Sequence, residues 1–142
     1  MTDMKRRLLY ISLFCIYAGA ILFLCLMKPD NLPEKEIFLF GLPADKLAHF
    51  TMFLPFPILS YLVFFKSDRS RLADIAILAS SICLGAGAAL GTEALQAMTQ
   101  YRSSDIHDAY ADFLGLVIGA AIVLTYILTM KNHNKTKETT EK

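Results

Sequence analysis

The sequence predicts an all-α protein, a four-helix transmembrane bundle with both termini in the cytoplasm. Of its 142 residues, 55% are hydrophobic and only 19% are charged, whereas a soluble domain has about 25% charged residues. Asp, Glu, Lys and Arg are also absent from four long stretches, 8–27, 47–65, 75–92 and 113–130. Each approaches the roughly 20 apolar residues that a helix needs to cross a bilayer. This composition predicts a protein that is embedded in a lipid bilayer, so the lipid bilayer is its expected partner. It excludes a soluble enzyme, a nucleic-acid-binding module and a disordered chain.

The four predicted spans belong to one domain, residues 1–130. Their expected bounds are about 8–27, 47–65, 73–92 and 110–130. The first span follows a basic segment, Lys5 to Arg7, as the apolar region of a signal peptide does. Its 20 apolar residues exceed the roughly 7–15 of a signal peptide, and no small-residue cleavage site follows it. We therefore interpret it as an uncleaved anchor.

The second span contains Pro55 and Pro57 near its middle. Because proline lacks a backbone N–H and clashes with the preceding turn, we expect a kink or break there. Small residues recur every four positions in the last two spans, at Ala79, Cys83, Gly87 and Gly91 and at Gly115 and Gly119. Small side chains let helices approach closely in lipid. We therefore expect the third and fourth spans to pack against each other through these faces.

The remaining segments are too short or too polar to cross a membrane. Residues 37–40 are apolar but short, which places them at the outer interface or beside the bundle. Residues 131–142 are polar without an apolar period, which predicts a disordered cytoplasmic tail.

The basic residues predict the orientation of the bundle. Ten of the 14 Lys and Arg residues lie at the N-terminus, in the connection 66–71 and in the tail. The other four lie in the connections 28–46 and 98–112. Because cytoplasmic loops carry an excess of Lys and Arg, both termini are expected in the cytoplasm and the two longer connections outside.

Polar residues gather at the outer ends of three spans. Ionisable residues that face the interior of a bundle at the membrane boundary mark functional sites. We therefore predict one outward-opening ligand-binding site. Its residues are Asp45, Lys46 and His49 at the start of the second span, Glu93 and Gln96 at the end of the third, Arg102 in the following connection, and Asp108 and Asp112 at the start of the fourth.

The charges of this layer limit its chemistry. Carboxylates outnumber the cations Lys46 and Arg102, which argues against a simple phosphate cradle. Histidine beside carboxylates suits general acid–base catalysis, so the catalytic candidates are His49, Glu93 and Asp108. The same groups suit a divalent cation, but no ligand motif of tight spacing is present, and we predict neither a metal nor another cofactor. A structural ion-pair network, in which Arg102 pairs with Asp108 or Glu93, is the alternative for the whole set.

These motifs, in this order, resemble those of the VanZ-like family of small bacterial integral membrane proteins. The resemblance covers about residues 43–119 and runs Asp45-Lys46-x-x-His49, Glu93-x-x-Gln96, Arg102, Asp108-x-x-x-Asp112-x-x-Gly115. The chain departs from the family at Asp112, where Asn is usual, and at Tyr101, where Gly is expected. The resemblance implies a multi-pass protein of the bacterial inner membrane. The family takes its name from a glycopeptide-resistance protein linked to lowered teicoplanin susceptibility.

Two functions remain open at this point. The first is a non-enzymatic cell-envelope protein whose outer polar site binds a lipid-linked envelope precursor or a glycopeptide. The second is a small membrane enzyme that acts on a lipid head group at the outer leaflet, with His49 as acid and base and Glu93 or Asp108 as its partner. The ligand and the oligomeric state are left open by the sequence.

Overall fold

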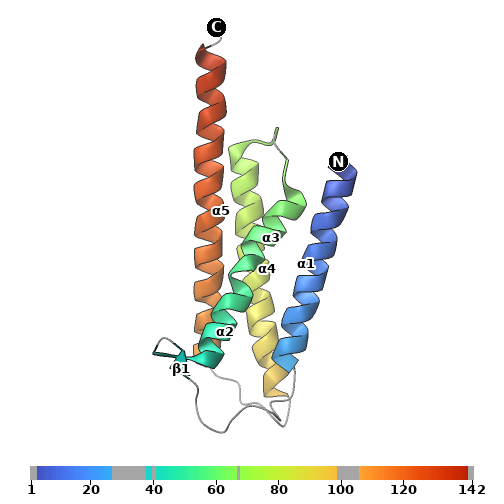
Figure 1. The fold of residues 1–142 in the computed structure, drawn as a ribbon, viewed down its shortest axis with the longest axis vertical. Coiled ribbons are helices and arrows are strands. Elements are labelled where there is room, and N and C mark those ends of the chain that lie inside the picture. The colour runs from blue at the N-terminus through green and yellow to red at the C-terminus, as the bar shows by residue number, and fades with distance from the viewer. Residues whose placement is uncertain (1–2, 27–37, 40, 67, 99–105, 141–142) are drawn as a thin grey trace.

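The fold is a bundle of long helices that lie side by side. The structure is a computed structural model that describes residues 3–26, 38–39, 41–66, 68–98 and 106–140, with side chains as far as Thr129. Within these ranges the helices are α1 (Asp3–Leu26), α2 (Ala44–Phe53), α3 (Pro55–Phe64), α4 (Arg71–Ala97) and α5 (Ile106–Thr140). Figure 1 shows α1, α4 and α5 along the length of the bundle, with α2 and α3 crossing them and both termini at the same end.

Within the described residues, four helical segments are long and apolar enough to cross a membrane, which confirms the predicted all-α bundle of four spans. They are Asp3–Leu26, Ala44–Phe64, Arg71–Ala97 and Ile106–Thr129. The helix α4 begins at a capped end, because the Ser70 side chain accepts a hydrogen bond of 3.3 Å from the backbone N–H of Ala73.

The second span is broken at Leu54, as its two prolines predict. Helix α2 ends at Phe53 and α3 begins at Pro55, so the two form one span, Ala44–Phe64, with an interruption. The Tyr17 hydroxyl of α1 donates a hydrogen bond to the backbone carbonyl of Met52, just before this break. Tyr17 thereby joins α1 to the interrupted span.

A short hairpin precedes α2. Strand β1 (Phe38–Leu39) pairs antiparallel with β2 (Leu42–Pro43). Gly41 in the turn has φ +80°, a conformation that residues with a Cβ rarely adopt. The Phe38 side chain is exposed, as expected for an apolar segment at an interface, whereas the neighbouring residues 37 and 40 lie outside the described part of the chain.

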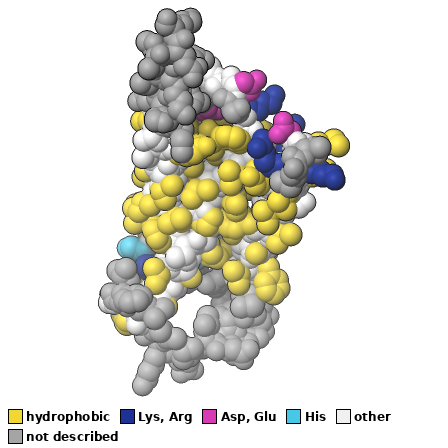
Figure 2. Space-filling view, turned by 45° about the horizontal axis from the view of Figure 1, so that its top comes forward, with side chains coloured by type: hydrophobic (Ala, Val, Ile, Leu, Met, Phe, Trp, Pro, Cys, Tyr) yellow, Lys and Arg dark blue, Asp and Glu magenta, His cyan; other side chains and the backbone are white. Residues whose placement is uncertain are grey.

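The side chains of the bundle are arranged with apolar groups outside and several polar groups inside. Leu8, Ile16, Phe23 and Leu84 are among many large apolar side chains that are exposed, and Figure 2 shows such side chains covering the middle of the molecule. Buried polar residues include His49, Asp74, Glu93 and Asp112. Soluble proteins rarely expose apolar surface on this scale, so this arrangement is that of a membrane protein.

The small residues of the last two spans do not meet as predicted. A Cβ added to Gly87 or Gly91 would meet no atom within 4 Å. A Cβ on Gly115 would instead collide with the backbone of Phe50 and Leu54. The prediction of the contact faces was therefore wrong, because the helix that lies closest to the glycines of α5 is the interrupted second span.

Helices α4 and α5 do pack together, but through another face of α4. A Cβ on Gly85 would approach the Leu116 side chain of α5 at 2.5 Å. On the same side of α4, the hydroxyl of Ser81 forms a hydrogen bond with the hydroxyl of Ser60 in α3. The face of α4 that carries Gly85 thus points into the bundle, and the face that carries Gly87 points outward.

The backbone of α5 continues beyond the membrane span. The helix runs to Thr140, so residues 131–140 are helical where the sequence predicts a disordered tail. Extending an existing helix avoids the unfavourable nucleation step that an isolated polar helix requires. The span therefore provides the helical start that the composition of the tail alone does not reveal.

Candidate functional site

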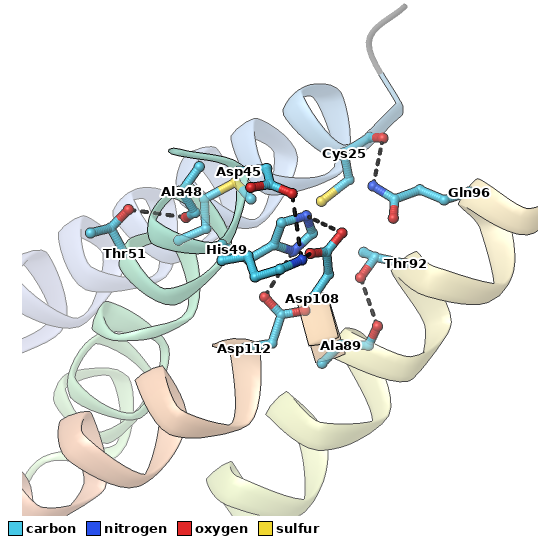
Figure 3. Close-up of polar contacts among 12 residues, drawn as sticks. Cys25, Asp45, Ala48, His49, Thr51, Ala89, Thr92, Gln96, Asp108 and Asp112 are labelled. Atoms are coloured by element: carbon cyan, nitrogen blue, oxygen red, sulfur yellow. Dashed lines mark hydrogen bonds and ion pairs between the residues drawn. The ribbon is translucent and has the colours of Figure 1, made fainter. Parts of the chain in front are cut away.

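The site lies at the end of the bundle opposite the two termini, where α2 and α5 begin and α4 ends. Figure 3 shows side chains of these three helices pointing toward one another, with Cys25 of α1 beside them. The residues that α2 turns inward are Lys46, His49 and Phe53. Their spacing of three and four residues places them on one face of a helix.

Lys46 and Asp108 form the outer part of the site. The Lys46 ammonium donates a hydrogen bond of 2.9 Å to Oδ1 of Asp108, which is buried. Asp45 lies 3.6 Å from the same ammonium, but half of its side chain is exposed. Asp45 therefore lies at the exposed edge of the site, whereas Lys46 reaches the buried carboxylate.

His49 and Asp112 form the inner part of the site. Nδ1 of His49 lies 3.0 Å from Oδ1 of Asp112, and both side chains are almost completely inaccessible. Nε2 of the same ring lies 3.7 Å from Oδ2 of Asp108. The imidazole therefore lies between two carboxylates of α5 that are four residues, or about one helical turn, apart.

Glu93 and Gln96 bring α4 into the site. Both are buried, and the Gln96 amide donates a hydrogen bond of 3.0 Å to the backbone carbonyl of Cys25 in α1. One ligand atom each of Glu93, His49 and Asp112 lie within 4.8 Å of one another. The structure thus brings together six of the eight predicted residues: Lys46, His49, Glu93, Gln96, Asp108 and Asp112. Asp45 lies at the exposed edge, and Arg102 is outside the described residues.

The close packing of α5 against α2 explains why these side chains meet. Gly115 follows Asp112 by three residues, and Phe50, whose backbone it approaches, directly follows His49. Without a side chain at Gly115 the two backbones come close enough for the short Asp112 side chain to reach the imidazole. The glycine and the hydrogen-bonded pair therefore depend on the same helix contact.

Sequence reasoning missed two features of the polar interior. The partner of His49 at hydrogen-bond distance is Asp112, whereas the sequence favoured Glu93 or Asp108. The spacing of four residues between Asp108 and Asp112 was a signal for this arrangement. At the opposite end of α4, Asp74 is completely buried, 3.8 Å from the Arg69 guanidinium. Asp74 was not among the residues that the sequence analysis singled out.

A family model described as VanZ/LLP1 matches residues 14–129. The chain belongs to the VanZ/LLP1 family. The matched range contains the whole site and most of each span, so it confirms the resemblance carried by the polar motifs. Together with the four membrane-capable helices, it identifies a VanZ-like multi-pass membrane protein. No curated protein and no solved structure is significantly similar to the chain.

Proposed function

We propose that this VanZ/LLP1 protein binds a cell-envelope ligand, such as a lipid-linked peptidoglycan precursor, through the polar site formed by α2, α4 and α5. The observation that carries the proposal is the convergence of Lys46, His49, Glu93 and Asp108 at one end of a membrane bundle. Ionisable groups buried in such a bundle are costly to maintain and usually serve a function.

The orientation proposed for the bundle places this site at the outer face of the bacterial inner membrane. Both termini lie at the opposite end of the bundle (Figure 1), and the excess of basic residues there favours the cytoplasm. A site at the outer face can meet lipid-linked precursors where the cell wall is assembled. A link to teicoplanin-type glycopeptide resistance rests on the family resemblance, and we propose it only as a consequence of ligand binding.

One observation favours the alternative, an enzyme that acts on a lipid head group. Nδ1 of His49 lies 3.0 Å from Oδ1 of Asp112, and in the neutral tautomer with the N–H at Nδ1 this N–H donates to the carboxylate and the lone pair of the ring is on Nε2. Within the described residues Nε2 has no hydrogen-bond partner. An imidazole oriented by a carboxylate in this way is suited to act as a general base. In this alternative, His49 transfers the proton and Asp112 orients the ring.

The two functions are separated by one experiment on the full chain in lipid nanodiscs. A fluorescent lipid-linked peptidoglycan precursor is added, and binding and chemical turnover are measured together. Saturable binding without turnover supports the proposed function, whereas turnover supports the enzyme. The variant His49→Ala should remove either signal. Ser60→Ala, which changes a buried hydroxyl outside the site, should leave the signal unchanged. Absence of both binding and turnover with folded wild-type protein would contradict both functions.

A further inference from the structure

We propose that His49, Glu93 and Asp112 bind one divalent transition-metal ion. They come from three different helices, α2, α4 and α5, and each side chain is more than nine-tenths buried. One ligand atom from each lies within 4.8 Å of the other two. An imidazole with two carboxylates is a donor set for ions such as Zn²⁺ or Mn²⁺. This inference goes beyond the envelope ligand, because binding of the ion requires no lipid-linked molecule.

Two buried atoms of this group indicate that a partner is missing. Nε2 of His49 and Oδ2 of Asp112 are inaccessible, and neither has a hydrogen-bond partner among the described residues. Buried polar atoms are nearly always satisfied by protein, water or an ion. A cation among these side chains supplies the missing interaction for a carboxylate that is itself completely buried.

The geometry requires only a small adjustment. Two ligand atoms bonded at about 2.1 Å to a tetrahedral ion lie roughly 3.4 Å apart. The ligand atoms of His49, Glu93 and Asp112 lie within 4.8 Å of one another. Rotation of these side chains about their own bonds brings the three donors closer together around an ion.

The test measures metal binding by the purified full chain in detergent, without an envelope ligand. Protein treated with a chelator is dialysed against Mn²⁺ or Zn²⁺, and bound metal is measured by elemental analysis. We expect about one ion per chain, and an increase in the unfolding temperature on metal addition that the chelator reverses. Asp112→Asn and Glu93→Gln should each weaken metal binding by more than about tenfold. Loss of an outer-shell contact already costs about tenfold, and loss of a direct ligand should cost more.

Matched controls distinguish this site from adventitious binding. His107→Gln removes an exposed histidine near the site, and a Cys15→Ser/Cys83→Ser double variant removes two exposed thiols. Both control proteins should retain the ion. Loss of the ion in either control, or less than about a tenth of an ion in folded wild-type protein, would overturn the proposal.

A further readout does not depend on the folding of the variants. Co²⁺ titrated into wild-type protein should develop d–d absorption bands that saturate at one equivalent and disappear when Zn²⁺ is added. A spectrum like that of the free aqueous ion would contradict coordination by these residues. If the chelated protein still binds the lipid-linked precursor but takes up no metal, only the metal site is refuted. Metal uptake without precursor binding refutes the proposed function and leaves the metal site standing.

Discussion

At the scale of a residue, the contacts of Lys46 show that burial determines how much an ion pair contributes to stability. Its ammonium lies 2.9 Å from the Asp108 carboxylate and 3.6 Å from the Asp45 carboxylate. Asp108 is buried, whereas Asp45 is half-exposed. An exposed ion pair contributes little because water and salt screen it, but loss of a buried partner leaves the remaining charge poorly solvated.

Asp108→Asn should therefore destabilise the protein much more than Asp45→Asn. We expect Asp108→Asn to lower the free energy of unfolding by about 1.5–3 kcal/mol, the value of a buried hydrogen bond to a charged group. Asp45→Asn should change it by less than about 0.5 kcal/mol, as is usual for surface substitutions. Denaturation of both proteins in the same detergent checks this, and equal losses would contradict the assigned role of Asp108.

Gln96 provides a second prediction at this scale, because its amide donates to the buried Cys25 carbonyl of α1. Gln96→Leu removes this donor, and we expect a loss of about 1–3 kcal/mol in unfolding free energy. Thr129→Val is the control, since its exposed hydroxyl bonds only to carbonyls of its own helix. Thermal unfolding followed by circular dichroism makes the comparison. A Gln96→Leu protein as stable as the control would show that α1 does not depend on this bond.

At the scale of the elements, the contact between α5 and the interrupted second span positions the site. A Cβ on Gly119 would collide with the Leu54 carbonyl at the break, and a Cβ on Gly115 with the Phe50 carbonyl one turn earlier. Both glycines thus face backbone, which cannot move aside as a flexible side chain can. The inward surface of α2, with His49, is held against Asp112 by this contact.

Gly115→Leu and Gly119→Leu should consequently lower folded yield and thermal stability. Overpacking of a close interface costs about 1–3 kcal/mol, and the penalty here falls on backbone atoms. The matched control is Gly87→Leu in α4, where an added Cβ meets no atom within 4 Å. Size-exclusion profiles and unfolding temperatures of the three proteins provide the measurement. Loss of stability in the control, with unchanged α5 variants, would reverse our assignment of the packed faces.

At the scale of the whole molecule, the charge distribution gives the bundle two different ends. The end with both termini carries Arg6, Arg69 and Arg71 on described segments, and Figure 2 shows basic side chains there beyond the apolar middle. The other end carries the buried site. Because the N- and C-termini of a chain with four spans lie on the same side of the membrane, the location of either terminus determines on which side the site opens.

A topology reporter measures this orientation. An alkaline phosphatase fused after Met130 should be inactive, because this enzyme requires the oxidising exterior and Met130 is expected in the cytoplasm. The same reporter inserted after Lys35, in the connection before the hairpin, should be active. Activity after Met130 together with silence after Lys35 would place the site in the cytoplasm and contradict an outward-facing ligand.

The sequence by itself determined the membrane class, the number of spans, the break next to Pro55 and the polar residues of the candidate site. These features follow from local chemistry: an apolar stretch of about 20 residues matches the thickness of a bilayer, and proline lacks the N–H that a helix needs. Six site residues were found together because motifs at the ends of three spans reach the same membrane boundary.

Only the tertiary structure decided which helix faces meet. Helix α4 carries small residues on two faces, one with Gly85 and Ala89 and the other with Gly87 and Gly91, and the first of these faces packs inside. Likewise Lys46, and not Asp45, turns inward beside His49. In lipid both faces of a helix are apolar, so burial gives neither face an advantage, and close packing between helices makes the choice.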